Sequence, residues 1–453
     1  MVIGGKSSCF FTVLPHPQPS KHGCLDPSAK TGPQRKCHTM NINPILEKTQ
    51  NRSLQVSNWL ICYVLPLGWL ALLTGMFWIG DRSHYHKLFY ATLALPTLIA
   101  LVLQPSQLKT LLHQPLIKLF LLFAAYILLS VLWADTDESP LSSIKRPLYL
   151  LMLLFAAFLI SIKHLGRLER MTEIAAIISV FAAGLSLAYF FYQGASGRLS
   201  GYGALYNPLL SAHVFGFFCA YWLSRWHLEE KAAPLLPLAA LAITWTLLIF
   251  TGSRTPLLAL SVCLLWLAIC QWKPRVLLVN AAAIGLALMV KALLSFTTPI
   301  ELQADSLLIR GMSYRPAIWQ EALRQIQDSP WFGLGYGHPQ VFRVEGLDFA
   351  LADPHNIELA VLFCGGIVGL TLWMLMYGYA MTYAWQQRRQ PAVPIASTLV
   401  VFGFVAGLTE GEAFFSRPKE HWFLIWIPLA LLAATRLNRQ QPVEKHHGPT
   451  KKA

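Results

Sequence analysis

Long apolar segments recur along this chain of 453 residues, and they constrain its fold more than any other feature. Most have about 16–25 residues, the length that a helix needs to cross roughly 30 Å of hydrocarbon. We expect twelve transmembrane helices, at residues 59–79, 88–104, 115–133, 147–162, 171–193, 208–226, 234–251, 255–272, 275–294, 355–384, 393–409 and 421–435. The sequence therefore predicts an all-α polytopic membrane protein.

The composition agrees with this fold class. Apolar residues make up 55% of the chain and charged residues 13%, which is about half of their usual share in a soluble domain. The mean hydropathy is +0.47. These values exclude a disordered chain, a coiled coil and an ordinary cytosolic enzyme.

The net charge of +14 does not indicate a nucleic-acid partner, because the Lys and Arg residues lie in the tails and in short loops. We expect membrane lipids, and no nucleic acid, around the chain. The loops that would face inward hold more Lys and Arg than those that would face outward. This asymmetry predicts that both termini are cytoplasmic.

The chain divides into five parts. We expect a cytoplasmic tail at 1–58, nine spans within 59–294, an outer loop subdomain at 295–354, three spans within 355–435 and a second cytoplasmic tail at 436–453. Residues 1–39 are polar and either form a disordered tail or are not translated. In the second interpretation the protein begins at Met40, which opens the sequence MNINPILEKTQNRS.

The outer loop between the ninth and tenth expected spans is the longest polar stretch within the membrane part. A structureless loop of about sixty residues is uncommon unless it has a function. It contains a helix signal, with Ser313 as the cap and an end at Asp328-Ser329-Pro330. The apolar side of this helix is formed by Trp319, Ala322, Leu323 and Ile326.

Metal, nucleotide and disulfide chemistry find little support in the sequence. Five of the eight cysteines lie in apolar segments and three in the N-terminal tail, so no disulfide framework is expected. The run FGLGYG at 332–337 lacks the strand and helix of a nucleotide fingerprint, and we interpret it as a turn. We interpret the acidic pairs Asp135/Asp137 and Glu410/Glu412 as exposed loop charges rather than as a divalent-ion site. No cofactor is expected.

Three arginines at the expected outer ends of apolar segments are candidates for binding an anion. Arg254 lies in the tight turn GSRTP, where the alternative is a charge that only sets orientation. Arg198 lies in a Gly-rich loop, and Arg315 opens the loop helix, whose free N–H groups favour an anion. Because guanidinium groups match phosphate oxygens, these positions predict an anionic ligand at the outer interface.

His355 is the candidate for acid–base chemistry. It lies in LADPHNIELAVLF at the start of the tenth expected span, between Asp353 and Asn356. A lone interfacial histidine is often structural. However, a neutral imidazole is the commonest general base near neutral pH, and the three arginines are expected on the same side of the membrane.

These segments together resemble a known family. SYRPAIWQEALRQIQDSPWFGLGYG, followed by DPHNIELAVLFCGGIVGL, is similar to the core of the bacterial O-antigen ligase and polymerase superfamily. GSRTP also looks like that family, and EGEAFFSRPKEHWFLIWIPLALL looks closer to its ligase branch. The resemblance covers nearly all of the chain after Met40.

The resemblance implies a multi-pass protein of the bacterial inner membrane with about twelve transmembrane helices and a periplasmic loop subdomain over the active site. It implies an O-antigen ligase of lipopolysaccharide biosynthesis, a metal-independent and inverting glycosyltransferase. The donor would be a glycan linked to undecaprenyl diphosphate, and the acceptor a sugar hydroxyl of lipid A–core. His355 would be the general base, and Arg254 and Arg315 would bind the diphosphate. Arg198, Asp353 and Asn356 would contact substrate.

Three alternatives stay open. An O-antigen polymerase or an O-linked protein glycosyltransferase would use the same lipid-linked donor. A transporter would be expected to show internal repeats and acidic residues in mid-span, and the sequence shows neither. Gel electrophoresis of lipopolysaccharide from a deletion strain would separate the ligase from the polymerase.

Overall fold

The computed structural model describes residues 44–136, 139–195, 197–229, 235–271, 314–344, 349–411 and 413–437. The chain divides into two units, Met1–Lys48 and Thr49–Ala453, and the description below concerns the second. The predicted ninth span, most of the first half of the outer loop, and residues 1–39 lie outside the described residues.

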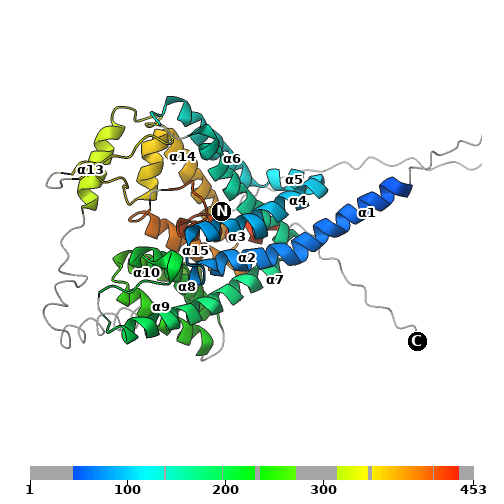
Figure 1. The fold of residues 1–453 in the computed structure, drawn as a ribbon, viewed down its shortest axis with the longest axis horizontal. Coiled ribbons are helices and arrows are strands. Elements are labelled where there is room, and N and C mark those ends of the chain that lie inside the picture. Colours follow the sequence, from blue (N-terminus) through cyan, green and yellow to red (C-terminus); the bar gives the residue numbers. More distant parts are fainter. Residues whose placement is uncertain are drawn as a thin grey trace, which may run out of the picture. The chain divides into compact units, whose positions relative to one another are not determined.

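The regular elements among the described residues are all helices, apart from one bridge between Phe342 and Leu351 (Figure 1). The helices are α1 (Pro44–Trp59), α2 (Leu65–Thr74), α3 (Arg82–Phe89), α4 (Leu95–Leu103), α5 (Pro105–Leu112), α6 (Pro115–Leu129), α7 (Pro140–Tyr192), α8 (Pro208–Leu228), α9 (Leu235–Phe250), α10 (Arg254–Gln271), α13 (Arg315–Ile326), α14 (Ile357–Gln386), α15 (Ala392–Gly407), α16 (His421–Leu424) and α17 (Trp426–Leu437).

Six helical segments are long and apolar enough to cross a membrane, and they confirm the prediction of an all-α polytopic membrane protein. They are Asn51–Phe77, Arg82–Leu103, Pro115–Trp133, Pro140–His164, Gly166–Tyr192 and Ile357–Gln386. Four shorter apolar helices coincide with four of the six other expected spans, at Leu235–Phe250, Arg254–Cys270, Ala392–Gly407 and His421–Leu437. Of the remaining two, 208–226 coincides with α8, and 275–294 lies outside the described residues. The total of twelve spans stays a prediction.

Proline shapes the first two of these segments in a way that the apolar pattern did not predict. A π-helical turn, Leu60–Val64, precedes Pro66, and a second one, Tyr90–Ala94, precedes Pro96. Proline has no N–H and its ring crowds the carbonyl four residues earlier, so a wider turn relieves the clash. The Cys62 carbonyl freed by Pro66 accepts a hydrogen bond from Arg167 Nη1 at 2.6 Å.

The short cytoplasmic loop predicted between 162 and 171 is absent from the described residues. Instead α7 runs through both expected spans and changes direction at His164, whose φ of −158° and ψ of 96° are not helical. The basic residues predicted to lie in a loop therefore lie on a helix, where Arg167 packs over the ring of Tyr63. A single kink replaces the loop.

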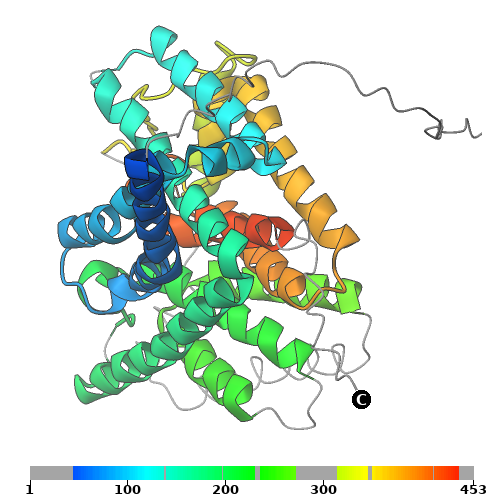
Figure 2. The same cartoon turned by 90° about the vertical axis from the view of Figure 1, so that its right-hand side faces the viewer.

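The core forms around α8 and α17, which are buried along most of their length. A helix that is apolar on all sides is stable only when other helices surround it. α8 packs against α9, α10 and α15, and α17 contacts α7, α14 and α15 (Figure 2). These contacts hold the ends of α14 and α15 in place, and the candidate site lies at those ends.

The long helix α14 is interrupted at Gly366, which has a φ of 60°. The run at 332–337 lies against this break and replaces the missing helical hydrogen bonds. Leu334 N donates to Phe363 O at 2.8 Å, and Gly335 N donates to Cys364 O at 2.9 Å. Non-helical backbone in a membrane segment is tolerated where protein groups satisfy it, as they do here. The glycine-rich run is therefore a structural turn, in agreement with the prediction.

We expect Gly366→Ala to destabilise the protein strongly. A Cβ there would lie 2.4 Å from the Trp331 backbone, and a left-handed φ alone costs about 1–3 kcal/mol. Gly378→Ala on the same helix is the control, because no atom lies within 4 Å of its added Cβ. Thermal unfolding in detergent measures both variants. Equal melting temperatures would contradict this role of Gly366.

Candidate active site

Helix α13 places Arg315 at the site. It begins at Arg315, has Pro316 in its first turn, and buries the apolar residues Ile318, Ala322 and Ile326. α13 packs against α14 (Figure 1), and Trp319 Nε1 donates to the carbonyl of Pro354 at 2.9 Å. The predicted loop helix is thus confirmed, with Tyr314 rather than Ser313 in the cap position.

His355 occupies a strained turn immediately before α14. Its φ of 48° is left-handed, a conformation that few residues other than glycine adopt, with His, Asn and Asp among the exceptions. Asp353 Oδ1 accepts a hydrogen bond from His355 N at 2.6 Å. Asn356 Oδ1 caps α14 by accepting from Leu359 N at 2.9 Å. These two predicted substrate contacts therefore also fix the backbone around His355.

Glu410 joins Arg315 to His355. Its Oε1 accepts a hydrogen bond from Arg315 Nη2, and its Oε2 lies 3.6 Å from His355 Nδ1. Asp353 Oδ2 lies 3.5 Å from the same nitrogen. The Glu410 side chain is only 4% exposed, so its interpretation as an exposed loop charge was wrong. The loop between α15 and α16 folds inward at Gly411, whose φ is 95°.

The contact between His355 and Glu410 shifts the pKa of both side chains. The contact with Glu410 raises the pKa of His355 above its ordinary value, although burial acts in the opposite direction. Burial raises the pKa of Glu410, but His355 and the neighbouring positive charges lower it to a net value below normal. Both carboxylates face Nδ1. The other nitrogen, Nε2, is therefore the one that remains for a substrate.

The other two predicted arginines converge on the turn before α10. Arg198 Nε donates to the carbonyl of Thr251 at 2.7 Å, and Arg254 is the first residue of the helix. The next residue, Thr255, hydrogen-bonds through its hydroxyl to Thr409 at 2.9 Å. Because Thr409 precedes Glu410, this bond ties the Arg254 turn to the loop that carries Glu410.

Arg324 of α13 is 67% exposed and pairs with Glu321, which is typical of a solvated side chain. Asp137 and Glu412, two of the residues that we interpreted as exposed loop charges, lie outside the described residues. In the described part of the chain, no group of three or more His, Cys, Asp or Glu side chains is arranged to hold a metal ion.

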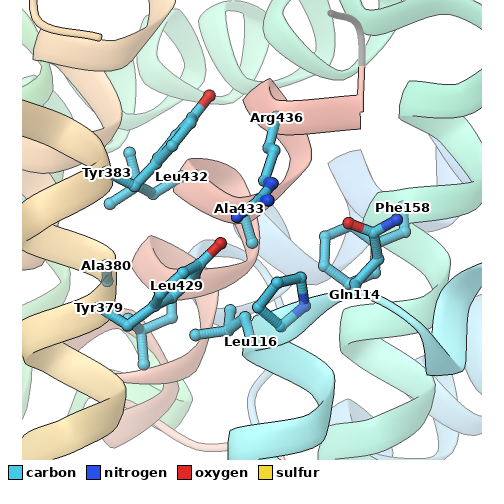
Figure 3. Close-up of a pocket in the computed structure, with 11 residues that line it drawn as sticks. Gln114, Leu116, Phe158, Tyr379, Ala380, Tyr383, Leu429, Leu432, Ala433 and Arg436 are labelled. Carbon is cyan, nitrogen blue, oxygen red and sulfur yellow. The ribbon is translucent and has the colours of Figure 1, made fainter. Parts of the chain in front are cut away.

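A separate pocket lies at the opposite end of α14 (Figure 3). Tyr379 and Tyr383 line it from the last turns of that helix, together with Arg436 of α17 and Gln114, which precedes α6. The Arg436 guanidinium lies over the Tyr379 ring. Because His355 precedes the first turn of α14, this pocket is not part of the candidate site.

The fold and its site define a multi-pass membrane protein with a half-buried histidine, a buried carboxylate beside it, and arginines at the starts of two helices. Residues 239–374, which include Arg254, Arg315 and His355, match a family described as O-antigen ligase. The chain is 50% identical over 373 residues to an O-antigen ligase of Pseudomonas aeruginosa, covering 82% of this chain and 90% of that protein.

The chain therefore belongs to the O-antigen ligase family, and the resemblance found in its motifs is confirmed. Membership implies a multi-pass protein of the inner membrane and an enzyme of glycosyl transfer. Arg198 and Glu410 lie outside the part that the family description matches.

Proposed function

We propose that this protein transfers a glycan from undecaprenyl diphosphate to a sugar hydroxyl of lipid A–core on the periplasmic face of the inner membrane. The family relationship supports the reaction class, and 50% identity to a ligase favours a ligase over a polymerase. The observation that carries the proposal is the contact of one buried carboxylate, Glu410, with both His355 and Arg315. The contact supports the proposal because it would hold the proposed base, His355, beside the proposed anion-binding group, Arg315.

In the proposed reaction the acceptor oxygen attacks the anomeric carbon of the donor. The bond from that carbon to the diphosphate oxygen breaks, and His355 Nε2 takes the proton of the hydroxyl. A single displacement of this kind inverts the anomeric configuration. The reaction needs neither a metal ion nor a nucleotide, so ligation should persist in a chelator such as EDTA.

The arginines would act on the leaving group. The diphosphate gains negative charge as it departs, and guanidinium groups placed in advance stabilise that charge best. Arg315 is oriented by Glu410 and lies in the first turn of α13, where the helix dipole also favours an anion. Arg254 occupies the equivalent position on α10. Arg198 supports the turn before Arg254 and contacts substrate less directly.

We expect Glu410→Gln to move the acidic limb of the pH–rate profile to lower pH. His355 faces Glu410 and Asp353, and the charge of Arg315 also acts there. A protonated histidine cannot act as a base, so activity should rise as the pH passes the raised pKa of His355. Removing the Glu410 charge lowers that pKa.

The measurement is kcat/KM against pH for purified enzyme. Glu321→Gln, which removes a half-buried carboxylate of α13 that pairs with Arg324, is the control and should leave the profile in place. A lower rate with an unmoved acidic limb in Glu410→Gln would show that Glu410 acts only on folding. It would thereby remove the main support for His355 as the base.

The periplasmic placement of the site follows from the distribution of Lys and Arg. In a background without the native cysteines, Gln320→Cys on α13 should react with a membrane-impermeant thiol reagent in intact spheroplasts. Gln387→Cys, which follows α14, should react only after lysis. The reverse labelling pattern would place the site on the cytoplasmic face and exclude the proposed acceptor.

A further inference from the structure

A second arginine–glutamate pair lies beside the candidate site. Arg82, the first residue of α3, has its Nη2 3.4 Å from Glu420 Oε2. The Glu420 side chain is 3% exposed, whereas 36% of the Arg82 side chain is exposed. The guanidinium also lies 5.5 Å from the centre of the Tyr206 ring. This pair repeats the pattern of Arg315 and Glu410, with a buried carboxylate holding a more accessible arginine.

Two buried histidines connect the two pairs. His421 follows Glu420, and a methyl group added to Gly411 would lie 3.0 Å from its Nε2. Since Gly411 follows Glu410, His421 lies beside the loop that carries Glu410, and its Nδ1 is 4.0 Å from Glu420 Oε1. His213 of α8 lies against His421, with ring centres 6.3 Å apart. The group therefore extends from Arg315 to Arg82.

Several buried polar atoms in this group have no hydrogen-bond partner among the described residues. They are Arg82 Nε, both ring nitrogens of His213 and Nδ1 of His421. His213 is only 1% exposed and His421 6%. Buried polar groups are normally satisfied, and most of these nitrogens can donate. A ligand rich in acceptor oxygens would complete them.

We infer that Arg82 binds phosphate oxygens of the donor's diphosphate, so that the diphosphate lies between Arg82 and Arg315 and faces the pair of histidines. This inference rests on the proposed function, because the diphosphate is the donor of that reaction. Arg82 is a binding residue here, and Glu420 positions it. A guanidinium that one carboxylate already holds on one side keeps other N–H groups for a phosphate.

A simpler role for Arg82 would be to neutralise the buried Glu420. Removing one partner of a buried ion pair is destabilising in itself, so Arg82→Gln alone cannot separate the two roles. The double variant Arg82→Gln/Glu420→Gln removes both charges and leaves two neutral amides. Arg82→Lys keeps the charge that balances Glu420 but loses the planar fork.

The experiment measures the binding of undecaprenyl diphosphate to the purified full chain in detergent, from the rise in melting temperature with ligand concentration. Undecaprenol, which has the same lipid chain without phosphates, gives the contribution of the lipid alone. Arg225→Gln is the control, because the Arg225 side chain is 37% exposed, close to the 36% of Arg82, and pairs with Glu173 near the C-terminal end of α8. Donor and acceptor kinetics of ligation are recorded in parallel.

We expect both Arg82→Gln and the double variant to bind undecaprenyl diphosphate about 10- to 100-fold more weakly, the effect of losing one charge-assisted hydrogen bond. The affinity of Arg82→Lys for undecaprenyl diphosphate should lie between that of these two variants and that of the wild type. The Arg82 variants should bind undecaprenol as the wild type does, and Arg225→Gln should bind undecaprenyl diphosphate as the wild type does. In the Arg82 variants, kcat/KM should fall for the donor and not for the acceptor.

Two results would overturn the inference. Wild-type binding in the double variant would reduce Arg82 to a counter-charge for Glu420. A loss of kcat/KM confined to the acceptor would assign Arg82 to an anionic group of that substrate. Failure of the proposed function looks different, because the wild-type enzyme itself would then not ligate glycan to lipid A–core.

Discussion

His355→Ala should lower ligation by about 10²–10⁴-fold, the contribution of a positioned general base, while the protein stays inserted in the membrane. His355→Asn is the sharper variant. Asparagine tolerates the left-handed backbone that His355 adopts, so the turn before α14 should be preserved. Its amide cannot accept a proton near neutral pH, and we expect it to be nearly as inactive as the alanine variant.

A second histidine provides the control for this experiment. His84 Nδ1 lies 2.8 Å from Asp81 Oδ2, so this histidine also has a carboxylate partner. Both side chains of this pair are exposed. His84→Ala should therefore ligate normally. Robust activity in His355→Asn would make His355 an orienting residue. A retained anomeric configuration in the product would require a covalent nucleophile instead of a base.

Arg315→Lys should be the next most damaging change, with a loss of about 10²–10³-fold that matches the removal of a charge-stabilising group at a transition state. A lysine keeps the positive charge but cannot hold both Glu410 and a phosphate with a planar fork. Arg254→Lys should show a loss of the same kind. The rates come from reconstituted enzyme at equal abundance.

Arg324→Lys is the control within α13, because Arg324 is exposed and bonds to Glu321 on the helix surface. It should ligate at the wild-type rate. Near-normal ligation by Arg315→Lys would show that any positive charge suffices at that position. It would contradict a bidentate contact between Arg315 and the diphosphate.

Regular periodicity and local motifs were sufficient to predict α13. The spacing of Trp319, Ala322 and Ile326 defined the helix, and Asp328-Ser329-Pro330 marked its end. His355 and Arg315 could also be identified as candidates from the sequence, because each lies in a short motif at the end of an apolar or helical segment. Features that depend on a few neighbouring residues were therefore predicted well.

The burial of Glu410 could not be predicted from the sequence. In the sequence it lies in a short polar run with a second glutamate nearby, which is the usual pattern of a solvated loop. Its burial depends on the packing of His421 against Gly411 and on the hydrogen bond between Thr255 and Thr409, both of which join distant parts of the chain. The same holds for Arg82 and Glu420, which are 338 residues apart.

Backbone irregularities inside the spans were also not predicted. The apolar pattern shows where a segment crosses the membrane, but the break of α14 at Gly366 depends on the 332–337 run that satisfies its carbonyls. The prolines at positions 66 and 96 gave the only local signal of the π-helical turns before them.

The most direct test uses a strain that lacks the gene and is complemented with wild type, His355→Asn or Glu410→Gln at equal abundance. Lipopolysaccharide is separated by electrophoresis, and lipid-linked polymer is quantified in the same cells. We expect wild type to restore long glycans on lipid A–core. We expect His355→Asn to leave bare core with accumulated undecaprenyl diphosphate-linked polymer. A core that carries a single repeat unit in the deletion strain would identify a polymerase and contradict the proposed ligation.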